Sequence, residues 1–272
     1  MRTFEVITSR QNPKVLEAAS LCRTKDRKET GLFFFEGKKL LEEAVNRKVP
    51  LSALFVREDV EPDRSLLEKI GTDCRLYKVT GSVYEKISAE KSPEGIFCIA
   101  KALDKFHKFA TIYYKREFFQ EQARTLLFCV SIRDPGNLGS IIRSAAAFGC
   151  EGLILSEDCA DVDHPKTIRA SMGTVFDFPI VTVKDAEKSV AALKDEGRCV
   201  YAAALRRDAM RTVDIDPKQR CVFLIGNEGH GLPPELIEQC DGAVFIPMSE
   251  KAESLNASVA ASVLLYERYV RN

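Results

Sequence analysis

The chain has 272 residues, of which 45% are hydrophobic, and this length and content suffice for two ordinary globular domains. Its 40 basic and 40 acidic side chains cancel, so the net charge gives no argument for a nucleic-acid partner. The distribution is uneven, because the chain is mildly basic up to Ala123 and mildly acidic from Arg124 onward.

The nine cysteines lie singly within apolar runs, without a Cys-x-x-Cys pair, which predicts buried free thiols. The three histidines, His107, His164 and His230, are too far apart for a local zinc motif, so we expect no metal. No charged and then apolar leader opens the chain, and no apolar run approaches the ~20 residues that span a bilayer. We therefore expect a cytoplasmic protein that does not bind a membrane.

Residues 1–100 alternate between helical and strand patterns and predict a small α/β domain. The expected elements, in order, are a helix at NPKVLEAASLC, a strand at LFFFEG, a helix at KKLLEEAVNR, a strand at ALFVR, a helix at SLLEKIG, and strands at CRLYKV and GIFCIAK. Residues 101–123 mix charged and aromatic residues without a repeat, which indicates a connector.

Residues 124–272 alternate more regularly and form the second expected domain. Its apolar runs are LLFCVSI, GLILS, CVYAAAL, CVFLIG and AVFIPM, each with a helical pattern after it or close by. Strands separated in this way predict a mainly parallel sheet covered on both faces, whose ligand binds at the carboxyl ends of the strands.

Three segments lie at such strand ends: Asp134–Gly149, Leu224–Leu236 and Ile246–Ala260. In the first, Pro135 and Gly136 predict a turn, and Arg143 follows about one turn into a helix, where its fork suits a phosphate. A turn with a surface arginine is the alternative for this segment read alone.

In the second segment, Gly226, Gly229 and Gly231 surround Asn227 and Glu228. No Lys-Ser/Thr pair follows and the G-x-G-x-x-G spacing is absent, which disfavours nucleoside triphosphates and dinucleotides. Glycines beside an acidic residue suit close backbone contact with a neutral or cationic small molecule, although a flexible loop is an equally good interpretation.

In the third segment, Ser254 and Asn256 stand at the expected start of a helix. Capping of exposed N–H groups is the default role for such residues. Together with Asn137 they are also suited to orienting a hydroxyl group and an arginine, provided that the three segments converge.

In order and spacing, the three segments resemble the three motifs of the SpoU (TrmH-like) RNA methyltransferases of the SPOUT superfamily. RASMGTVFDFPI resembles the segment that links them, and ITSRQNPKV, TGLFFFEG and KKLLEEA resemble the ribosomal-protein-like α/β domain that binds the family's substrate. Glu250 and Ala257 depart from the usual Gly and Val of the third motif. The ordered set is specific even though each motif alone is weak.

The resemblance implies methyl transfer from S-adenosylmethionine to a ribose 2′-hydroxyl of structured RNA, with ribosomal RNA favoured over transfer RNA. It also implies a C-terminal trefoil knot and a homodimer formed through the C-terminal domain. Carried over by motif, Gly226, Ile246 and Leu255 bind the cofactor. The polar reaction centre consists of Asn137, Arg143, Glu228, Ser254 and Asn256.

Eight basic residues lie within thirty positions of the front domain, and with a methyltransferase behind them we expect them to contact RNA. They are Arg10, Lys14, Arg23, Lys25, Arg27, Lys28, Lys38 and Lys39. Two alternatives stay open for the whole chain: an RNA-binding or assembly protein without turnover, and a base methyltransferase of the same superfamily. The Arg/Asn/Ser set fits ribose better than a ring nitrogen.

Overall fold

The computed structural model describes residues 3–102, 109–110, 124–227, 229–249, 251 and 253–271. Most of the expected connector, residues 103–108 and 111–123, lies outside them. The chain divides into two compact units. The first consists of Met1–Leu103 with Asp163–Phe176, and the second of Asp104–Val162 with Asp177–Asn272. The second half of the sequence therefore contributes a segment to the first unit.

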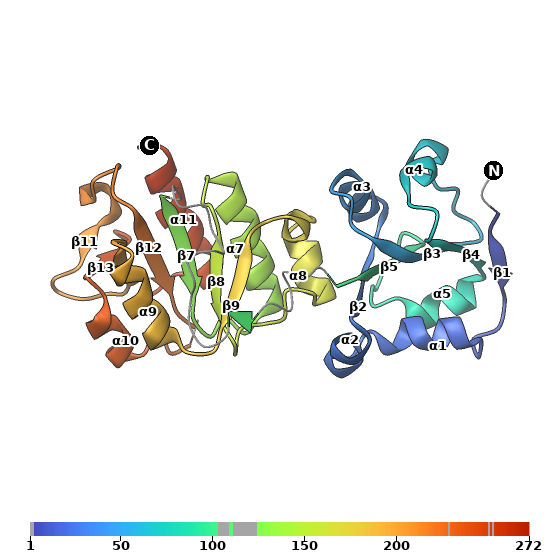
Figure 1. Ribbon diagram of the computed structural model, residues 1–272, viewed down its shortest axis with the longest axis horizontal. Helices are drawn as coiled ribbons and strands as arrows, with labels where there is room; N and C mark the ends of the chain where they lie inside the picture. The colour runs from blue at the N-terminus through green and yellow to red at the C-terminus, as the bar shows by residue number, and fades with distance from the viewer. Residues whose placement is uncertain are drawn as a thin grey trace. The chain divides into compact units, whose positions relative to one another are not determined.

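The first unit is built on a five-stranded sheet of order β1-β4-β3-β5-β2, in which β5 runs antiparallel to its neighbours β2 and β3. Its elements are β1 (Glu5–Ile7), α1 (Pro13–Ser20), α2 (Thr24–Thr30), β2 (Leu32–Glu36), α3 (Lys38–Asn46), β3 (Leu51–Arg57), α4 (Arg64–Lys69), β4 (Arg75–Val79), α5 (Gly81–Ile87), β5 (Ile96–Lys101), α8 (Pro165–Ala170) and the 3₁₀ helix η2 (Thr174–Phe176). Helices α1 and α5 cover one face of the sheet, and α3 and α4 cover the other (Figure 1).

Alternation along β2 gives the first unit two apolar surfaces, since successive side chains of a strand point to opposite faces. Phe34 stacks on Phe97 at a ring distance of 4.9 Å, within the core that α1 and α5 cover. Phe33 and Phe35 instead contact Phe176 of η2, at 6.2 and 5.1 Å between ring centres. The segment Asp163–Phe176 therefore supplies part of the apolar cover of this sheet.

Helix α2 was not expected from periodicity, because its sequence TKDRKET has no apolar stripe. It ends at Gly31, whose φ of 63° is the left-handed conformation that commonly terminates helices. Its single buried residue is Arg27. The helix is therefore held to the first unit through a charged side chain.

The second unit is built on an eight-stranded sheet of order β11-β13-β10-β12-β7-β8-β9-β6, and every neighbouring pair is parallel. Its elements are β6 (Phe109–Ala110), β7 (Thr125–Cys129), α7 (Pro135–Ala147), β8 (Leu153–Ser156), β9 (Ile180–Val183), α9 (Ala186–Asp195), β10 (Cys199–Ala203), β11 (Met210–Arg211), η3 (Thr212–Asp214), β12 (Cys221–Ile225), α10 (Pro234–Gln239), β13 (Gly242–Phe245) and α11 (Ala257–Tyr269). The expected parallel sheet is confirmed.

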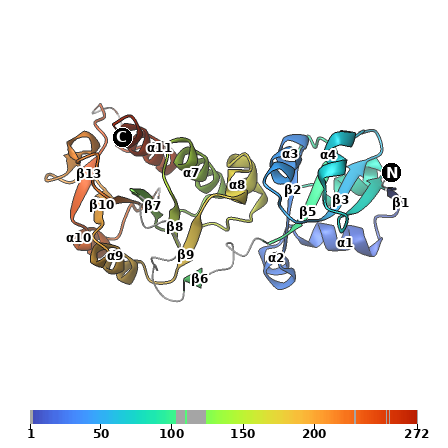
Figure 2. The ribbon, with the colours of Figure 1, turned by 45° about the horizontal axis from the view of Figure 1, so that its top comes forward.

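Helices cover both faces of this sheet, with α7 and α11 side by side on one and α9 and α10 on the other (Figure 2). All five residues of β7 and of β12 are buried, as expected for central strands that are covered on both sides. The carboxyl ends of β7, β12 and β13 lead into the three segments singled out in the sequence. The topology therefore gathers these segments at one edge of the sheet.

All nine cysteines are free thiols, and only Cys22 is exposed. Within the described ranges, the helices are too short or too polar to cross a bilayer.

Candidate functional site

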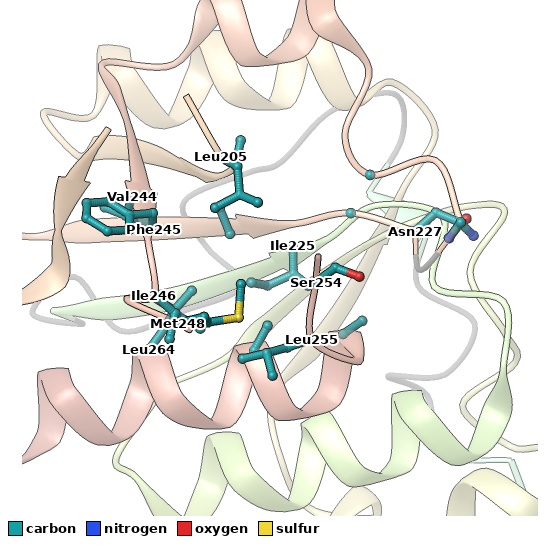
Figure 3. Close-up of a pocket in the computed structure, with 17 residues that line it drawn as sticks. Leu205, Ile225, Asn227, Val244, Phe245, Ile246, Met248, Ser254, Leu255 and Leu264 are labelled. Carbon is teal, nitrogen blue, oxygen red and sulfur yellow. The ribbon is translucent and has the colours of Figure 1, made fainter. Parts of the chain in front are cut away.

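A cavity of about 300 Å³ lies where β10, β12 and β13 end against the start of α11. Its lining consists of Ala203, Ala204, Leu205, Ile225, Gly226, Asn227, Gly229, Gly231, Val244, Phe245, Ile246, Met248, Ser254, Leu255, Ala257, Ala260 and Leu264. Figure 3 shows the apolar side chains of Leu205, Ile225 and Met248 facing the same space, with Asn227 at its far end. A largely apolar pocket with a few polar groups is typical of small-molecule sites.

The loop after β12 is folded back on itself, so that its backbone forms one wall of the cavity. Asn227 donates its N–H to the carbonyl oxygen of Gly231 at 3.1 Å, and the N–H of Gly231 donates to the carbonyl of Asn227 at 2.8 Å. A Cβ on Gly226 would lie 2.3 Å from the backbone carbon of Gly231. The fold of the loop therefore requires glycine at position 226.

The side chain of Asn227 also fixes this loop. Its Oδ1 accepts the N–H groups of Gly229 and His230 at 2.8 and 3.2 Å, and its Nδ2 donates to the carbonyl of Ser131 at 2.9 Å. His230 itself is an exposed loop residue. Glu228, the expected acidic member of the reaction centre, lies outside the described residues, as does Glu250.

Two asparagines expected in the reaction centre meet across the sheet edge, 119 residues apart in sequence. Nδ2 of Asn256 donates to Oδ1 of Asn137 at 3.1 Å. Asn256 also caps α11, because its Oδ1 accepts the N–H of Ser258 at 2.9 Å. The side chain of Asn256 thus caps α11 and at the same time joins the third segment to the first.

The third segment turns two further side chains toward the cavity. Leu255 and Ser254 both line it, together with Ile246 from the end of β13. All three residues expected to bind the cofactor, Gly226, Ile246 and Leu255, therefore line one cavity.

Arg143 stands apart from this cluster. It lies in the middle of α7 and is exposed, and its side chain makes neither a hydrogen bond nor an ion pair with any other residue that the structure describes. Asp134 caps the start of this helix, because its carboxylate accepts the N–H of Asn137 at 2.8 Å. Arg143 is thus held on the same rigid element as Asn137, with its guanidinium available to a ligand.

A polar cluster adjoins the site at the ends of β7 and β8. Asp158 accepts hydrogen bonds at 2.6 Å from the hydroxyl groups of Ser131 and Ser156, and one at 3.5 Å from Arg133. Partial burial alone would raise the pKa of Asp158, but these three hydrogen bonds and one from its own backbone outweigh it and lower the pKa below its ordinary value. The carboxylate is therefore ionised at neutral pH.

Among the residues that the structure describes, no group of three or more His, Cys, Asp or Glu side chains is arranged to hold a metal ion.

The eight residues expected to contact RNA fall into two groups. Seven are exposed in the first unit: Arg10, Lys14, Arg23, Lys25, Lys28, Lys38 and Lys39. Several of these pair with acidic neighbours three or four positions away, as Lys14 does with Glu17 and Lys25 with Glu29. Such exposed pairs contribute ~0–1 kcal/mol each and exchange readily for another anion.

Arg27 differs from the other seven because its side chain is fully buried. Its guanidinium donates to Asp163 at 3.3 Å, to the carbonyl of Leu21 at 3.2 Å and to Thr24 at 3.1 Å. The expectation that Arg27 contacts RNA is therefore corrected, since its guanidinium is an interior group of the first unit.

Sequence reasoning missed Leu205, which lines the cavity although it lies outside the three segments, and did not single out Met248 within the third segment. Leu205 follows β10 and is 66% exposed. Its position after a central strand, at the same sheet edge as the motifs, is the one signal in the sequence that pointed to it.

Comparisons with known proteins agree with this geometry. Residues 124–266 match the SpoU rRNA Methylase family, and residues 12–100 match the MRM3-like substrate binding domain. The 23S rRNA (guanosine(2553)-2′-O)-methyltransferase RlmP of Bacillus subtilis is 31% identical over 260 residues, which is 96% of this chain and 97% of that protein.

Two solved structures that contain S-adenosylmethionine (AdoMet) are similar over nearly the whole chain. The AdoMet-bound rRNA methyltransferase from Sinorhizobium meliloti has a TM-score of 0.82 and 30% identity, covering 97% of each chain. The SpoU methyltransferase AviRb from Streptomyces viridochromogenes, in complex with AdoMet, has a TM-score of 0.81 and 27% identity, covering 96% of this chain and 98% of that one.

Proposed function

Since the chain belongs to the SpoU rRNA methylase family, we propose that it methylates a ribose 2′-hydroxyl of 23S ribosomal RNA, with S-adenosylmethionine as the methyl donor. The observation that carries the proposal is the convergence of the second and third segments on one cavity, with Asn137 of the first segment bonded to Asn256 of the third. A ribosomal substrate also supports a cytoplasmic location.

The cavity suits the cofactor in size and chemistry. Its volume of about 300 Å³ lies within the range of small-molecule pockets, about 300–1,000 Å³. Ile225, Met248 and Leu264 offer apolar surface for a purine ring, and the folded loop from Gly226 to Gly231 offers backbone groups. When bound, S-adenosylmethionine supplies an activated methyl group on a sulfonium centre.

The polar residues beside the cavity suit the RNA side of the reaction. A ribose hydroxyl must lose its proton as it attacks, and its oxygen gains negative charge. Arg143 is a poor base because a guanidinium keeps its proton at neutral pH, but it is well suited to hold a neighbouring phosphate and to stabilise that charge. Asn137, Ser254 and Asn256 orient the ribose, and Glu228 completes the expected set.

We further propose a homodimer formed through α7 and α11. Val259, Val263 and Tyr266 of α11, with Val270 directly after the helix, follow one another at helical spacing and form one apolar stripe, in which Tyr266 is 52% exposed. Tyr266 packs edge to face on Phe148 next to α7, at a ring distance of 5.5 Å. An exposed apolar stripe of this kind is typical of a protein interface.

Mapping of 2′-O-methylation in total RNA tests the function directly. Cells that lack the gene should lose one ribose methyl group in 23S rRNA, and the purified protein should restore it to the unmodified RNA. Loss of a base methylation instead would favour the base methyltransferase. A protein that binds this RNA but neither binds the cofactor nor transfers a methyl group would favour the non-catalytic alternative.

Sedimentation at several protein concentrations tests the dimer. The wild-type chain should sediment as a dimer, and Tyr266→Glu should shift it to the monomer without changing the far-UV spectrum. A monomeric wild type at micromolar concentration would contradict the proposal.

A further inference from the structure

Ser131 lies directly beyond β7 in a strained conformation. Its φ of 57° is left-handed, and among the described residues other than glycine only Lys48 and Met172 share a positive φ. A side chain with a Cβ populates this region roughly five- to thirtyfold less readily than the right-handed one. Something in the surrounding structure must therefore hold Ser131 there.

Every polar group of Ser131 is engaged by a neighbouring strand end. Its N–H donates to Oγ of Ser156 at 2.8 Å, and its hydroxyl donates to Oδ2 of Asp158 at 2.6 Å. Its carbonyl accepts Nδ2 of Asn227 at 2.9 Å. Since Ser156 also donates to Oδ1 of Asp158 at 2.6 Å, one carboxylate holds both hydroxyl groups.

This network connects two parts of the site, the loop after β12 that lines the cavity and the start of α7. On one side, the carbonyl of Ser131 fixes Asn227, whose side-chain oxygen fixes two N–H groups of the loop that lines the cavity. On the other side, Asp134 and Asn137 begin α7 only three and six positions after Ser131. The turn at Ser131 thus sets where the cofactor loop and the asparagine stand.

We propose that Asp158 is a positioning residue for methyl transfer: by holding the hydroxyl of Ser131, it keeps this left-handed turn in place and, through Asn227, the cofactor loop. Asp158 acts through Ser131 and touches neither substrate nor cofactor. The inference rests on the proposed function, but the loop geometry that it concerns is measurable from cofactor binding alone.

The test compares Asp158→Ala in two backgrounds, wild type and Ser131→Gly. Glycine adopts a positive φ without strain and needs no hydroxyl contact to stay there. Alone, Asp158→Ala should raise the Kd for S-adenosylmethionine about tenfold and lower kcat by a similar factor, with the KM for RNA little changed. In the Ser131→Gly background the same substitution should change both values less than threefold.

Glu157→Gln is the matched control, because it removes the adjacent, exposed carboxylate and should leave both values unchanged. Equal effects of Asp158→Ala in the two backgrounds, or no effect in wild type, would overturn the inference. Calorimetric Kd values require no RNA, so they separate two failures. A wild type that binds cofactor with this mutational pattern but transfers no methyl group would refute only the proposed function.

Discussion

Two regions differ in how their polar residues come together. One is the edge of the second unit's sheet that carries the cavity, called the cofactor edge below. The other is the set of exposed lysines and arginines of the first unit, called the basic surface. At the cofactor edge, Asn137 meets Asn256 and Ser131 meets Asn227, over 119 and 96 residues of sequence. On the basic surface, Lys14 and Lys25 pair with neighbours three and four positions away. Convergence of distant polar residues marks the site of this methyltransferase, whereas local density of charge describes a solvated helix surface as well as it describes an RNA contact.

Arg143→Lys should reduce the rate of methyl transfer, and this is the largest effect that we expect. A lysine keeps the charge but loses the planar fork, so we expect kcat to fall about 100-fold or more while cofactor affinity is kept. Single-turnover methyl transfer gives the rate, and calorimetry gives the Kd for S-adenosylmethionine. An equal loss of cofactor affinity would contradict the assignment of Arg143 to the RNA side.

Arg27→Ala should lower the stability of the protein more than the loss of an exposed basic residue of the first unit does. Its removal leaves Asp163, whose side chain is 10% exposed, without its arginine, which costs on the order of 3 kcal/mol of unfolding free energy. Arg23→Ala is the matched control, because Arg23 is 73% exposed and its loss should cost less than ~1 kcal/mol. Denaturant unfolding of both variants measures the difference, and equal stabilities would contradict the structural role of Arg27.

Arg27 is buried and Arg23 is exposed, and this difference shows which features of the molecule the sequence can predict. Strand-end glycines, prolines and asparagines predicted the sheet edge, because parallel strands bring such turns together. The burial of Arg27 was not predictable, since its partner Asp163 lies 136 positions away in the opposite half of the chain.

Gly226→Ala, at the cofactor edge, should weaken cofactor binding. A Cβ at this position would lie 2.5 Å from the backbone nitrogen of Leu232, so the loop must shift. Overpacking of this kind costs about 1–3 kcal/mol, which corresponds to a roughly five- to 150-fold higher Kd for the cofactor. Gly71→Ala is the control, because a Cβ there meets nothing within 4 Å. Unchanged cofactor binding in Gly226→Ala would contradict the requirement for glycine.

The smallest expected effect concerns the basic surface. Arg23→Gln with Lys25→Gln removes two exposed charges of the α2 region and, if both contact phosphates, should weaken RNA binding a few-fold at moderate salt. Since each phosphate contact adds roughly 0.7–0.9 to the slope of log K against log salt, the slope should fall by about 1.5. Filter binding of 23S rRNA at several salt concentrations measures both values. An unchanged slope would mean that the pairs with Asp26 and Glu29 persist in the complex and that RNA contacts the first unit elsewhere.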